Sequence, residues 1–366
     1  MSKDDRLTFE QLLDESRRFG RDDFVINLGG LVEDVSDMLS SELAQGALIQ
    51  AREFIDHHGQ EPLQNGMSRL QVLTFGDSGN APELTDGKVA AVDGTPVLPL
   101  QKYSAGQALC VGIGSRSYTR LLDDVLHGYT SKAIMEDLQR ARNEDIKSFL
   151  RRVQDGIYSI SQTAYMRYFE VQHAMEVPEP LIFCDGTLVY EWLSNQYRGR
   201  ELYKDFLRRK QAIGIIKSTK DSVFMSWFGR ALVRGEVFIF ETLYDHIADM
   251  ARERNTRSGS SEAPQWESDV EFVALAKKVY RGVFKPAEKY FGFECHADHL
   301  DPMLRIMASD CQMNLPGHEI PFLLNEVDRE IRRFFKAEMV QMRIGEQLSV
   351  DSENLFFEET GEREFR

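Results

Sequence analysis

The sequence predicts an α/β fold in which a mixed β-sheet is flanked by helices, with a helical arm before the sheet and helical insertions within it. Two apolar runs carry this prediction, Val89–Thr95 and Pro180–Leu188, and each leads into Asp-Gly-Thr. Short apolar runs bounded by turn residues are typical of buried strands. The segments around them repeat apolar residues at helical spacing, so we expect strands and helices to alternate along the chain.

The bulk composition is that of an ordinary globular protein. The chain has 366 residues, four cysteines and a formal net charge of −15. This length allows a large core and either several domains or one with long insertions. No apolar run approaches the roughly 18 residues of a membrane span. The polar start lacks the pattern of a signal peptide, and the cysteines lack the spacing of a disulfide framework. We therefore expect a cytoplasmic protein without a membrane partner.

Three regions are expected along the chain. Residues 1–88 form an N-terminal helical arm and a connection, because apolar residues recur at helical spacing up to His58 and turn-forming residues follow. The arm either packs on the rest or offers a dimer or partner surface, and both interpretations stay open. Residues 89–342 form the main domain, and residues 343–366 form an acidic tail.

The first half of the main domain is expected to begin with strands. Val89–Val92, Thr95–Leu100 and Gln107–Ile113 have the composition of an antiparallel meander of three strands. Between Ser117 and Glu176 the apolar spacing predicts helices, the last of them over Ile160–Met175.

The second half is expected to alternate. Tyr190–Arg209 has a helical pattern, and Ala212–Ile216 is a buried strand. The remaining expectations are helical or mixed structure over Phe224–Val233 and Val237–Met250, a loop over Asn255–Glu267, a strand pair over Val270–Val279 and Tyr290–Cys295, and closing helices over Leu300–Met313 and Pro321–Met342.

Charged residues at the ends of the predicted strands form the candidate site. Asp93 and Asp185 each follow an apolar strand, Lys217 follows the next one, and Glu170 lies on the helix before the second strand. Two carboxylates at neighbouring strand ends suit a divalent cation with oxygen ligands. In-line attack on a phosphodiester uses such ions, and a lysine can hold the phosphate. This order of carboxylates is typical of RNase H-like nucleases. Glu191 is the alternative third carboxylate.

One basic stretch stands out in this acidic chain. Between Arg198 and Arg234 there are ten basic and three acidic residues, a local charge of +7. Such a stretch is the electrostatic footprint expected for a polyanion, here the DNA backbone. The candidate contacts are Arg208, Arg209, Lys210 and Lys220. The alternative is a solvated helix face whose ion-pair partners lie elsewhere.

The order of motifs resembles the NurA family of DNA-end-processing nucleases. The resemblance spans roughly Val89 to Arg333, and its segments are Ala91–Thr95, Arg167–Glu170, Phe183–Leu188, Gly214–Ser218 and, more weakly, His318–Glu326. It implies an RNase H-like core, Mn²⁺ or Mg²⁺ as cofactor, a homodimer, and docking on the hexameric ATPase HerA. It also implies DNA as the substrate.

The resemblance assigns roles to residues of this chain. Metal ligands are expected at Asp93, Glu170, Asp185 and Glu326, with catalytic roles for the first three and Lys217. Arg167, Lys217 and His318 are expected to contact DNA, with Arg167 positioning either Glu170 or a phosphate. The last motif departs from the family, whose members usually carry Tyr and His where this chain has His318 and Glu326.

Three functions are therefore weighed. The first is a metal-dependent DNA nuclease that works with a HerA-type ATPase in repair, end resection or anti-phage defence. The second, motivated by the altered last motif, is a catalytically inactive RNase H-fold subunit that caps or regulates an ATPase ring. The third is a phosphotransferase of similar fold, which the missing Gly-rich adenosine motif opposes. A zinc site is a minor alternative, since the spacing from Cys295 to His318 departs from paired CxxC ligands.

Overall fold

The computed structural model describes residues 42–59, 71–74, 81–96, 101–103, 106–130, 139–140, 147, 158–217, 223–258, 263–313, 320–336, 339 and 342. The helices expected before residue 42 and the acidic tail lie outside these ranges. None of the described helices has both the length and the apolar character needed to cross a membrane.

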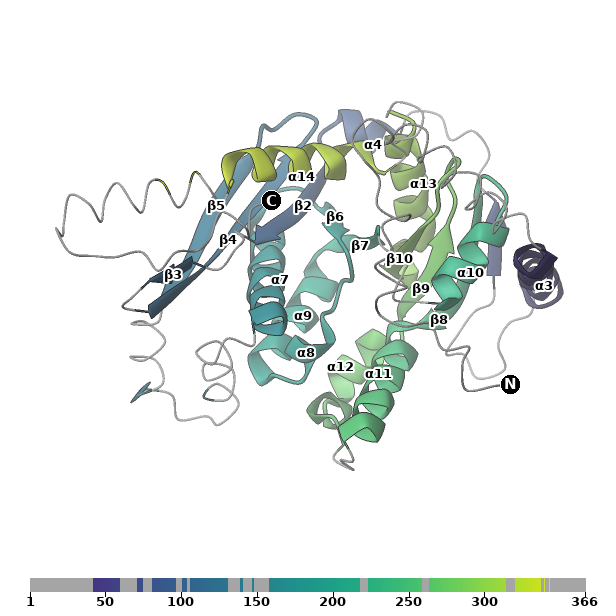
Figure 1. The fold of residues 1–366 in the computed structure, drawn as a ribbon. Coiled ribbons are helices and arrows are strands. Elements are labelled where there is room, and N and C mark those ends of the chain that lie inside the picture. Colours follow the sequence, from purple (N-terminus) through teal and green to yellow (C-terminus); the bar gives the residue numbers. More distant parts are fainter. Residues whose placement is uncertain are drawn as a thin grey trace, which may run out of the picture.

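The described residues form a ten-stranded mixed sheet in the order β1-β8-β9-β10-β7-β6-β2-β4-β3, with β5 also paired to β4 (Figure 1). The strands are β1 (Gln71–Thr74), β2 (Val89–Pro96), β3 (Gln101–Tyr103), β4 (Gly106–Ser117), β5 (Asp123–Thr130), β6 (Leu181–Asp185), β7 (Gln211–Ile216), β8 (Glu236–Thr242), β9 (Val279–Phe284) and β10 (Phe291–His296).

The centre of the sheet is parallel and its two wings are antiparallel. Strands β2, β6 and β7 run side by side in the same direction, with Val92 opposite Cys184 and Asp185 opposite Ile215. Parallel neighbours need a crossover connection, which here contains a helix in each case. The wings are the β4 group on one side and the run β10, β9, β8 and β1 on the other. The carboxyl ends of the three central strands therefore meet at one edge.

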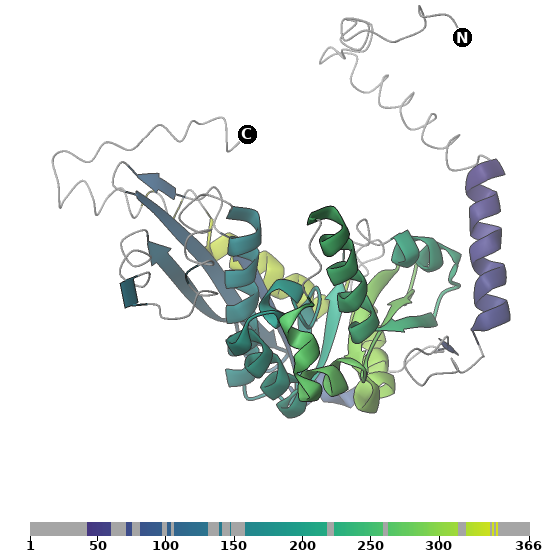
Figure 2. The same cartoon turned by 90° about the horizontal axis from the view of Figure 1, so that it is seen from below.

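Helices cover both faces of the sheet, as Figures 1 and 2 show from two directions. They are α3 (Glu42–His58), α4 (Pro82–Thr85), α7 (Tyr158–Glu176), α8 (Glu191–Ser194), α9 (Tyr197–Arg209), α10 (Val223–Ala231), α11 (Leu243–Ser258), α12 (Val270–Ala276), α13 (Leu300–Cys311) and α14 (Phe322–Phe334), with short 3₁₀ helices at Gln265–Ser268 and Ala297–His299. One face packs under α4, α13 and α14, and the other under α7, α9, α11 and α12. Helices α3 and α10 pack together beside β8 and β9.

The central strands are apolar on both sides because both sides are covered. In β2, Val89 and Ala91 pack in the core under α13 and α14, whereas Ala90 and Val92 pack in the core under α7 and α9. Successive side chains of a strand point to opposite faces. Continuous apolar runs are the expected signature of such doubly covered parallel strands. The fold class predicted from these runs, a mixed sheet flanked by helices, is confirmed.

Two predicted elements are wrong. The helical expectation over Ser117–Glu176 fails at β5, where residues 123–130 form a strand paired along β4. Its apolar residues match a helical period, but pairing with the preceding strand β4 decides the conformation. The strand expected over Val270–Val279 is a helix, α12, and only its last residue begins β9. The Asp269 carboxylate accepts the Phe272 N–H at 3.0 Å and caps that helix.

Smaller differences concern boundaries. The segment Val237–Met250, expected as helical or mixed, divides into β8 and α11, and α11 extends to Ser258 into the expected loop. In the meander, residues 97–100 lie outside the described ranges, and both β2 and β3 pair with β4. The segment expected as a connection before residue 89 contributes β1, which pairs with β8 in the same sheet.

Candidate functional site

Three of the predicted residues stand at the carboxyl ends of the three central strands. Asp93 lies in β2 directly after Val92, and Asp185 ends β6. Because Val92 and Cys184 are partners in the parallel ladder, the two aspartates are neighbours across it. Each aspartate is two positions beyond a residue of the core under α13 and α14, so both side chains point to that face. Lys217 follows β7 and reaches both aspartates.

The glycine after each aspartate makes room for another residue of the site. Gly186 has a φ of 76°, and the Arg167 guanidinium lies where a Cβ of residue 186 would stand. Gly94 is overlain by Oε1 of Glu170 in the same way. The Gly94 N–H also donates to Oδ1 of Asp93 at 2.7 Å. Glycine is thus required after each aspartate because side chains of α7 approach the backbone closely there, in addition to any need of a turn.

Positive and negative side chains alternate in the site. Nζ of Lys217 lies 3.2 Å from Oδ1 of Asp185 and 3.8 Å from Oδ2 of Asp93. Nη1 of Arg167 donates to Oε2 of Glu170 at 2.8 Å and also to the backbone carbonyl of Asp185. The i, i+3 meeting of Arg167 with Glu170 that the sequence predicts is present.

Burial governs the charges of the site. Asp93 is 1% exposed, and burial raises its pKa well above the ordinary carboxyl value. The negative charge of Asp185 raises the pKa of Asp93 further, and the positive charge of Lys217 lowers it. Burial also raises the pKa of Glu170, although Arg167 opposes the shift. For Lys217 burial acts to lower the pKa, but Asp93 and then Asp185 outweigh it and the pKa is raised. Each charge is therefore stabilised only by its neighbours.

Two buried carboxylate oxygens have no hydrogen-bond partner. They are Oδ2 of Asp93 and Oε1 of Glu170. A buried carboxyl oxygen without a hydrogen-bond partner is costly, so a proton, a water molecule or a cation is expected beside each of them. Among the described residues, however, no three His, Cys, Asp or Glu side chains stand close enough to ligate one ion as they are. Lys217 and Arg167 occupy the spaces between the carboxylates.

The donors fit a hard divalent cation in their chemistry. Asp93, Asp185 and Glu170 supply carboxylate oxygens, the ligands that Mg²⁺ and Mn²⁺ prefer. They would hold the ion after Lys217 has moved off the two aspartates. Their role as ligands stays a prediction.

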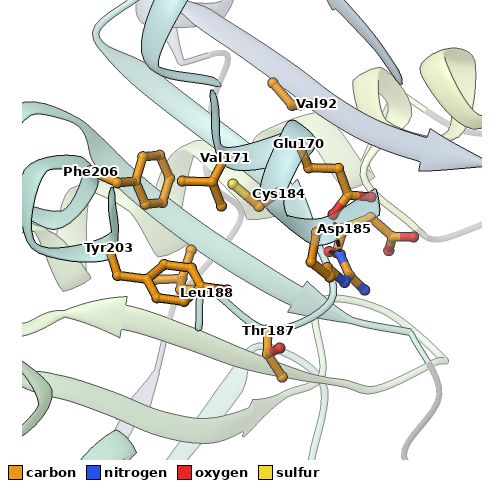
Figure 3. A pocket seen from close by; sticks show the side chains of 10 residues that line it. Val92, Glu170, Val171, Cys184, Asp185, Thr187, Leu188, Tyr203 and Phe206 are labelled. Atoms are coloured by element: carbon orange, nitrogen blue, oxygen red, sulfur yellow. Dashed lines mark hydrogen bonds and ion pairs between the residues drawn. The ribbon is translucent and has the colours of Figure 1, made fainter. Parts of the chain in front are cut away.

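A cavity of about 10 Å³ lies among these side chains, close to the minimum that holds one water molecule. Figure 3 shows Glu170 and Asp185 on one side of it and the rings of Tyr203 and Phe206 on the other. Glu170 and Asp185 thus border a small space with an apolar wall.

The structure gives Glu326 other partners. Its Oε2 lies 2.6 Å from Arg329 and 3.6 Å from Arg116 of β4. Asp328 of the same helix, and not Glu326, is the residue whose charge acts on Asp93 and Lys217. Positions two apart on a helix face different ways, so only one of them can turn to the site. The role of Glu326 as a metal ligand stays a prediction, and His318 lies outside the described residues.

The part of the basic stretch before β7 lies at the other end of the strands, whereas Lys217 of the same stretch belongs to the site. Arg208, Arg209 and Lys210 precede β7, whose amino end is opposite the edge that carries Asp185 and Lys217. Lys210 donates to the backbone carbonyls of Val177 at 2.6 Å and Glu179 at 3.0 Å.

Other residues of the stretch are used in packing between α9 and α12. Arg208 pairs with Glu271, and Nζ of Lys204 lies 3.1 Å from Asp269. That Arg208, Arg209 and Lys210 contact DNA stays a prediction. The alternative, a helix face with partners elsewhere, fits the described residues. Lys220 lies outside them.

Sequence reasoning missed a buried pair behind the site. Glu294 of β10 is fully buried; its Oε2 accepts the Leu188 N–H at 2.8 Å, and its Oε1 accepts from Nε of Arg281 at 2.7 Å. Arg281 also pairs with Glu241. This network holds the loop that directly follows Asp185. The signal was available: charged residues inside the apolar strands β9 and β10.

A larger groove opens beside the same loop and was also missed. It has a volume of about 880 Å³ and is lined by residues of the loop after β6, of α8 and of α11, together with Arg167, Asp185 and Lys217. Of its aromatic side chains, Tyr190 and Trp192 closely follow the motif Phe183–Leu188, whereas His246 is distant in sequence from the motifs.

Comparison with known proteins gives similarity in structure only. No family profile matches this sequence, and no curated protein sequence matches it. The NurA nuclease from Sulfolobus solfataricus is 9% identical with a TM-score of 0.40, over 88% of this chain and 98% of the nuclease. A NurA structure with manganese is 10% identical with a TM-score of 0.37, over 82% and 94%.

An endonuclease V from Bacillus subtilis is 10% identical with a TM-score of 0.36, over 83% of this chain and 96% of the enzyme. Two of these three solved structures are NurA proteins, the family that the motif order resembles. At these identities and TM-scores the likeness does not establish an activity.

Proposed function

We propose that this protein is a divalent-metal-dependent nuclease that hydrolyses DNA phosphodiester bonds. One observation carries the proposal: carboxylates from β2, β6 and α7 converge with two cations at the carboxyl edge of the central strands, and two of their buried oxygens lack a hydrogen-bond partner. Hydrolysis of a phosphodiester needs this combination of hard-cation ligands and phosphate-binding cations.

The residues would divide the work as follows. Asp93, Asp185 and Glu170 hold the ion, and the ion supplies a charge that activates water and stabilises the departing oxygen. Lys217 leaves the two aspartates and binds a non-bridging phosphate oxygen as a point charge. Arg167 stays on Glu170 and the Asp185 carbonyl and holds both in place.

The finer features of the proposal rest on the resemblance in motif order. They are action on DNA ends in the cytoplasm, use of Mn²⁺ or Mg²⁺, a homodimer, and a HerA-type hexameric ATPase as partner in repair or anti-phage defence. The formal charge of −15 supports a partner, because DNA must be brought to the site against repulsion from the rest of the surface.

The test is a nuclease assay on linear duplex and single-stranded DNA with Mn²⁺, with and without a HerA-like ATPase. Asp93→Asn and Asp185→Asn should each lower the cleavage rate at least about 100-fold, the scale of losing one electrostatic catalytic group. Asp86→Asn is the matched control, since Asp86 also precedes a glycine of positive φ but pairs only with exposed Lys88. Equal cleavage by all four proteins would refute the assignment.

A second function is favoured by one specific observation. Lys217 and Arg167 already neutralise the carboxylates, and no ready three-ligand group exists among the described residues. The protein would then be an inactive subunit that caps or regulates an ATPase ring. Calorimetric titration with Mn²⁺ separates the two: the nuclease binds the ion and loses binding in Asp93→Asn, whereas the inactive subunit shows no binding in either protein.

A further inference from the structure

The groove of about 880 Å³ continues outward from the proposed catalytic site. It shares Arg167, Asp185 and Lys217 with that site. Its other walls come from the loop after β6, from α8 and from α11. Helices α8 and α11 both lie below the sheet in Figure 1. A molecule in the groove would therefore touch both the phosphate-binding cations and these walls.

The walls are mostly uncharged and aromatic. Tyr190 and Trp192 come from the α8 side, and His246 comes from α11, with Ile247 and Met250 beside it. Burial, and then the nearby Arg281, lowers the pKa of His246 to about 3, so its ring is a neutral aromatic surface at neutral pH. Aromatic rings in a groove next to bound phosphate are the means by which proteins stack unpaired bases.

Positive charge is confined to one end of the groove. The cationic residues among its lining are Arg167 and Lys217, which lie at Asp185. Glu191 is the acidic lining residue besides Asp185, and its carboxylate accepts from Asn195 at 3.1 Å. The complementary ligand has an anionic group at one end and a flat, weakly polar body at the other, which is the form of a nucleotide.

The size of the groove excludes a double helix. Its volume lies within the range of about 300–1,000 Å³ that holds a small organic ligand. One or two nucleotides fit this space, whereas stacked base pairs do not.

We propose that this groove is a nucleobase subsite, which stacks one or two unpaired bases of a DNA strand on Trp192 and Tyr190 next to the phosphate at Asp185 and Lys217. The proposal rests on the nuclease function proposed above and adds a substrate requirement to it. Duplex DNA must unpair locally before the strand is cleaved.

The test measures binding, not cleavage. A labelled 12-nucleotide oligothymidylate and an abasic oligonucleotide of the same length are titrated with the full-length protein in EDTA at low salt, so that no hydrolysis occurs. Trp192→Ala should weaken binding of the thymidylate roughly 5- to 100-fold, the range for loss of a base stack. Binding of the abasic strand should change less than about twofold, since it offers a backbone but no base. Equal weakening for both strands overturns the proposal.

A conservative variant protects the test against misfolding. Trp192→Phe keeps a ring and should retain most of the affinity, but it should lose the quenching of tryptophan fluorescence by the thymidylate. Trp227→Phe is the control, because Trp227 lies on α10 and donates to the Ala47 carbonyl, away from the groove. Quenching that persists in Trp192→Phe and disappears in Trp227→Phe contradicts the proposal.

A second position tests the opposite wall. Met250→Glu adds a negative charge at a residue that is 41% exposed, so the fold should be kept. It should weaken thymidylate binding, while Met313→Glu, at an exposed methionine on another helix end, should not.

The outcomes separate this proposal from the function beneath it. If cleavage depends on Asp93 but binding through Trp192 does not depend on bases, the nuclease function is supported and the nucleobase subsite is refuted. If binding depends on bases but no divalent metal supports cleavage, the nucleobase subsite is supported and the nuclease function is refuted.

Discussion

Lys217 and Arg167 serve as built-in counter-charges for the candidate site. Asp93 is buried beside two other carboxylates, and its charge is supported by Lys217 at 3.8 Å. Lys217 in turn keeps its own charge because the aspartates outweigh its burial. A lysine between two ligands competes with a metal ion for the same oxygens. The residue-scale consequence is that metal binding and the position of Lys217 are linked.

Lys217→Met should therefore change the response to metal more than the fold. Without metal we expect a loss of about 1–3 kcal/mol in the free energy of unfolding, because the aspartates lose their counter-charge. With Mn²⁺ the melting temperature should rise more in the variant than in the wild type, because the ion no longer displaces a lysine. Thermal unfolding with and without Mn²⁺ measures both.

Lys88→Met is the control for that experiment. Lys88 also pairs with an aspartate, Asp86 at 3.1 Å, but both side chains are more than half exposed. Exposed pairs contribute little, so its metal response should equal that of the wild type. A Lys217→Met protein that responds to Mn²⁺ like the control would remove the linkage.

The loop after β6 is held by strands that carry none of the motif residues. Glu294 of β10 accepts the Leu188 N–H, and Arg281 of β9 connects Glu294 to Glu241 of β8. Three antiparallel strands thus fix the backbone that presents Asp185. An element built far along the chain positions a residue of the parallel centre.

Glu294→Gln tests this at the scale of elements. It keeps the shape of the side chain but removes the charge that faces Arg281, at an expected cost of about 3 kcal/mol in unfolding free energy. In the remaining folded protein we expect kcat for DNA cleavage to fall about tenfold with KM unchanged, because Asp185 is displaced rather than the DNA contacts. Glu271→Gln, in the exposed pair with Arg208, should change neither. A raised KM at normal kcat would contradict a positioning role.

Buried polar contacts, as well as an apolar core, hold together the helices on one face of the sheet. Asp310 of α13 is fully buried; its carboxylate accepts from Tyr118 Oη at 2.7 Å and from the Leu323 N–H at 3.0 Å. These contacts tie α13 to the chain after β4 and to the start of α14. Burial raises the pKa of Asp310 to about 6.

The sign of the resulting pH dependence follows from the two pKa values. The folded pKa of about 6 is above the unfolded value of about 3.9, so the stabilisation from this group is complete below pH 4 and is lost as pH rises through 6. Two pKa units correspond to about 3 kcal/mol. Urea unfolding between pH 4 and 7 should therefore show a flatter dependence in Asp310→Asn than in the wild type. Asp301→Asn, at an exposed position of α13, should keep the wild-type slope.

Local pattern determined the elements that make the centre of the sheet. Apolar runs ending in Asp-Gly specified β2 and β6, and the short apolar run before Lys217 specified β7. Helical spacing specified α7, which carries Glu170. Parallel strands buried on both faces need a continuous apolar sequence, and such a run can be recognised directly in the amino-acid sequence. Asp93, Asp185 and Lys217 could be predicted together because the carboxyl ends of parallel neighbours meet at one edge.

Tertiary structure alone decided the rest, because it depends on which segments become neighbours in the fold. β5 is a strand since β4 offers it a ladder, and its own apolar spacing favoured a helix. The charge of Asp328 acts on Asp93, whereas Glu326 pairs with Arg329. The orientation of α14 on the sheet decides which of the two side chains faces the site. The basic residues of α9 lie toward the opposite ends of the strands, where residues at the start of α12 supply ion-pair partners for Lys204 and Arg208. The groove between α8 and α11 exists only once both helices are packed on the sheet.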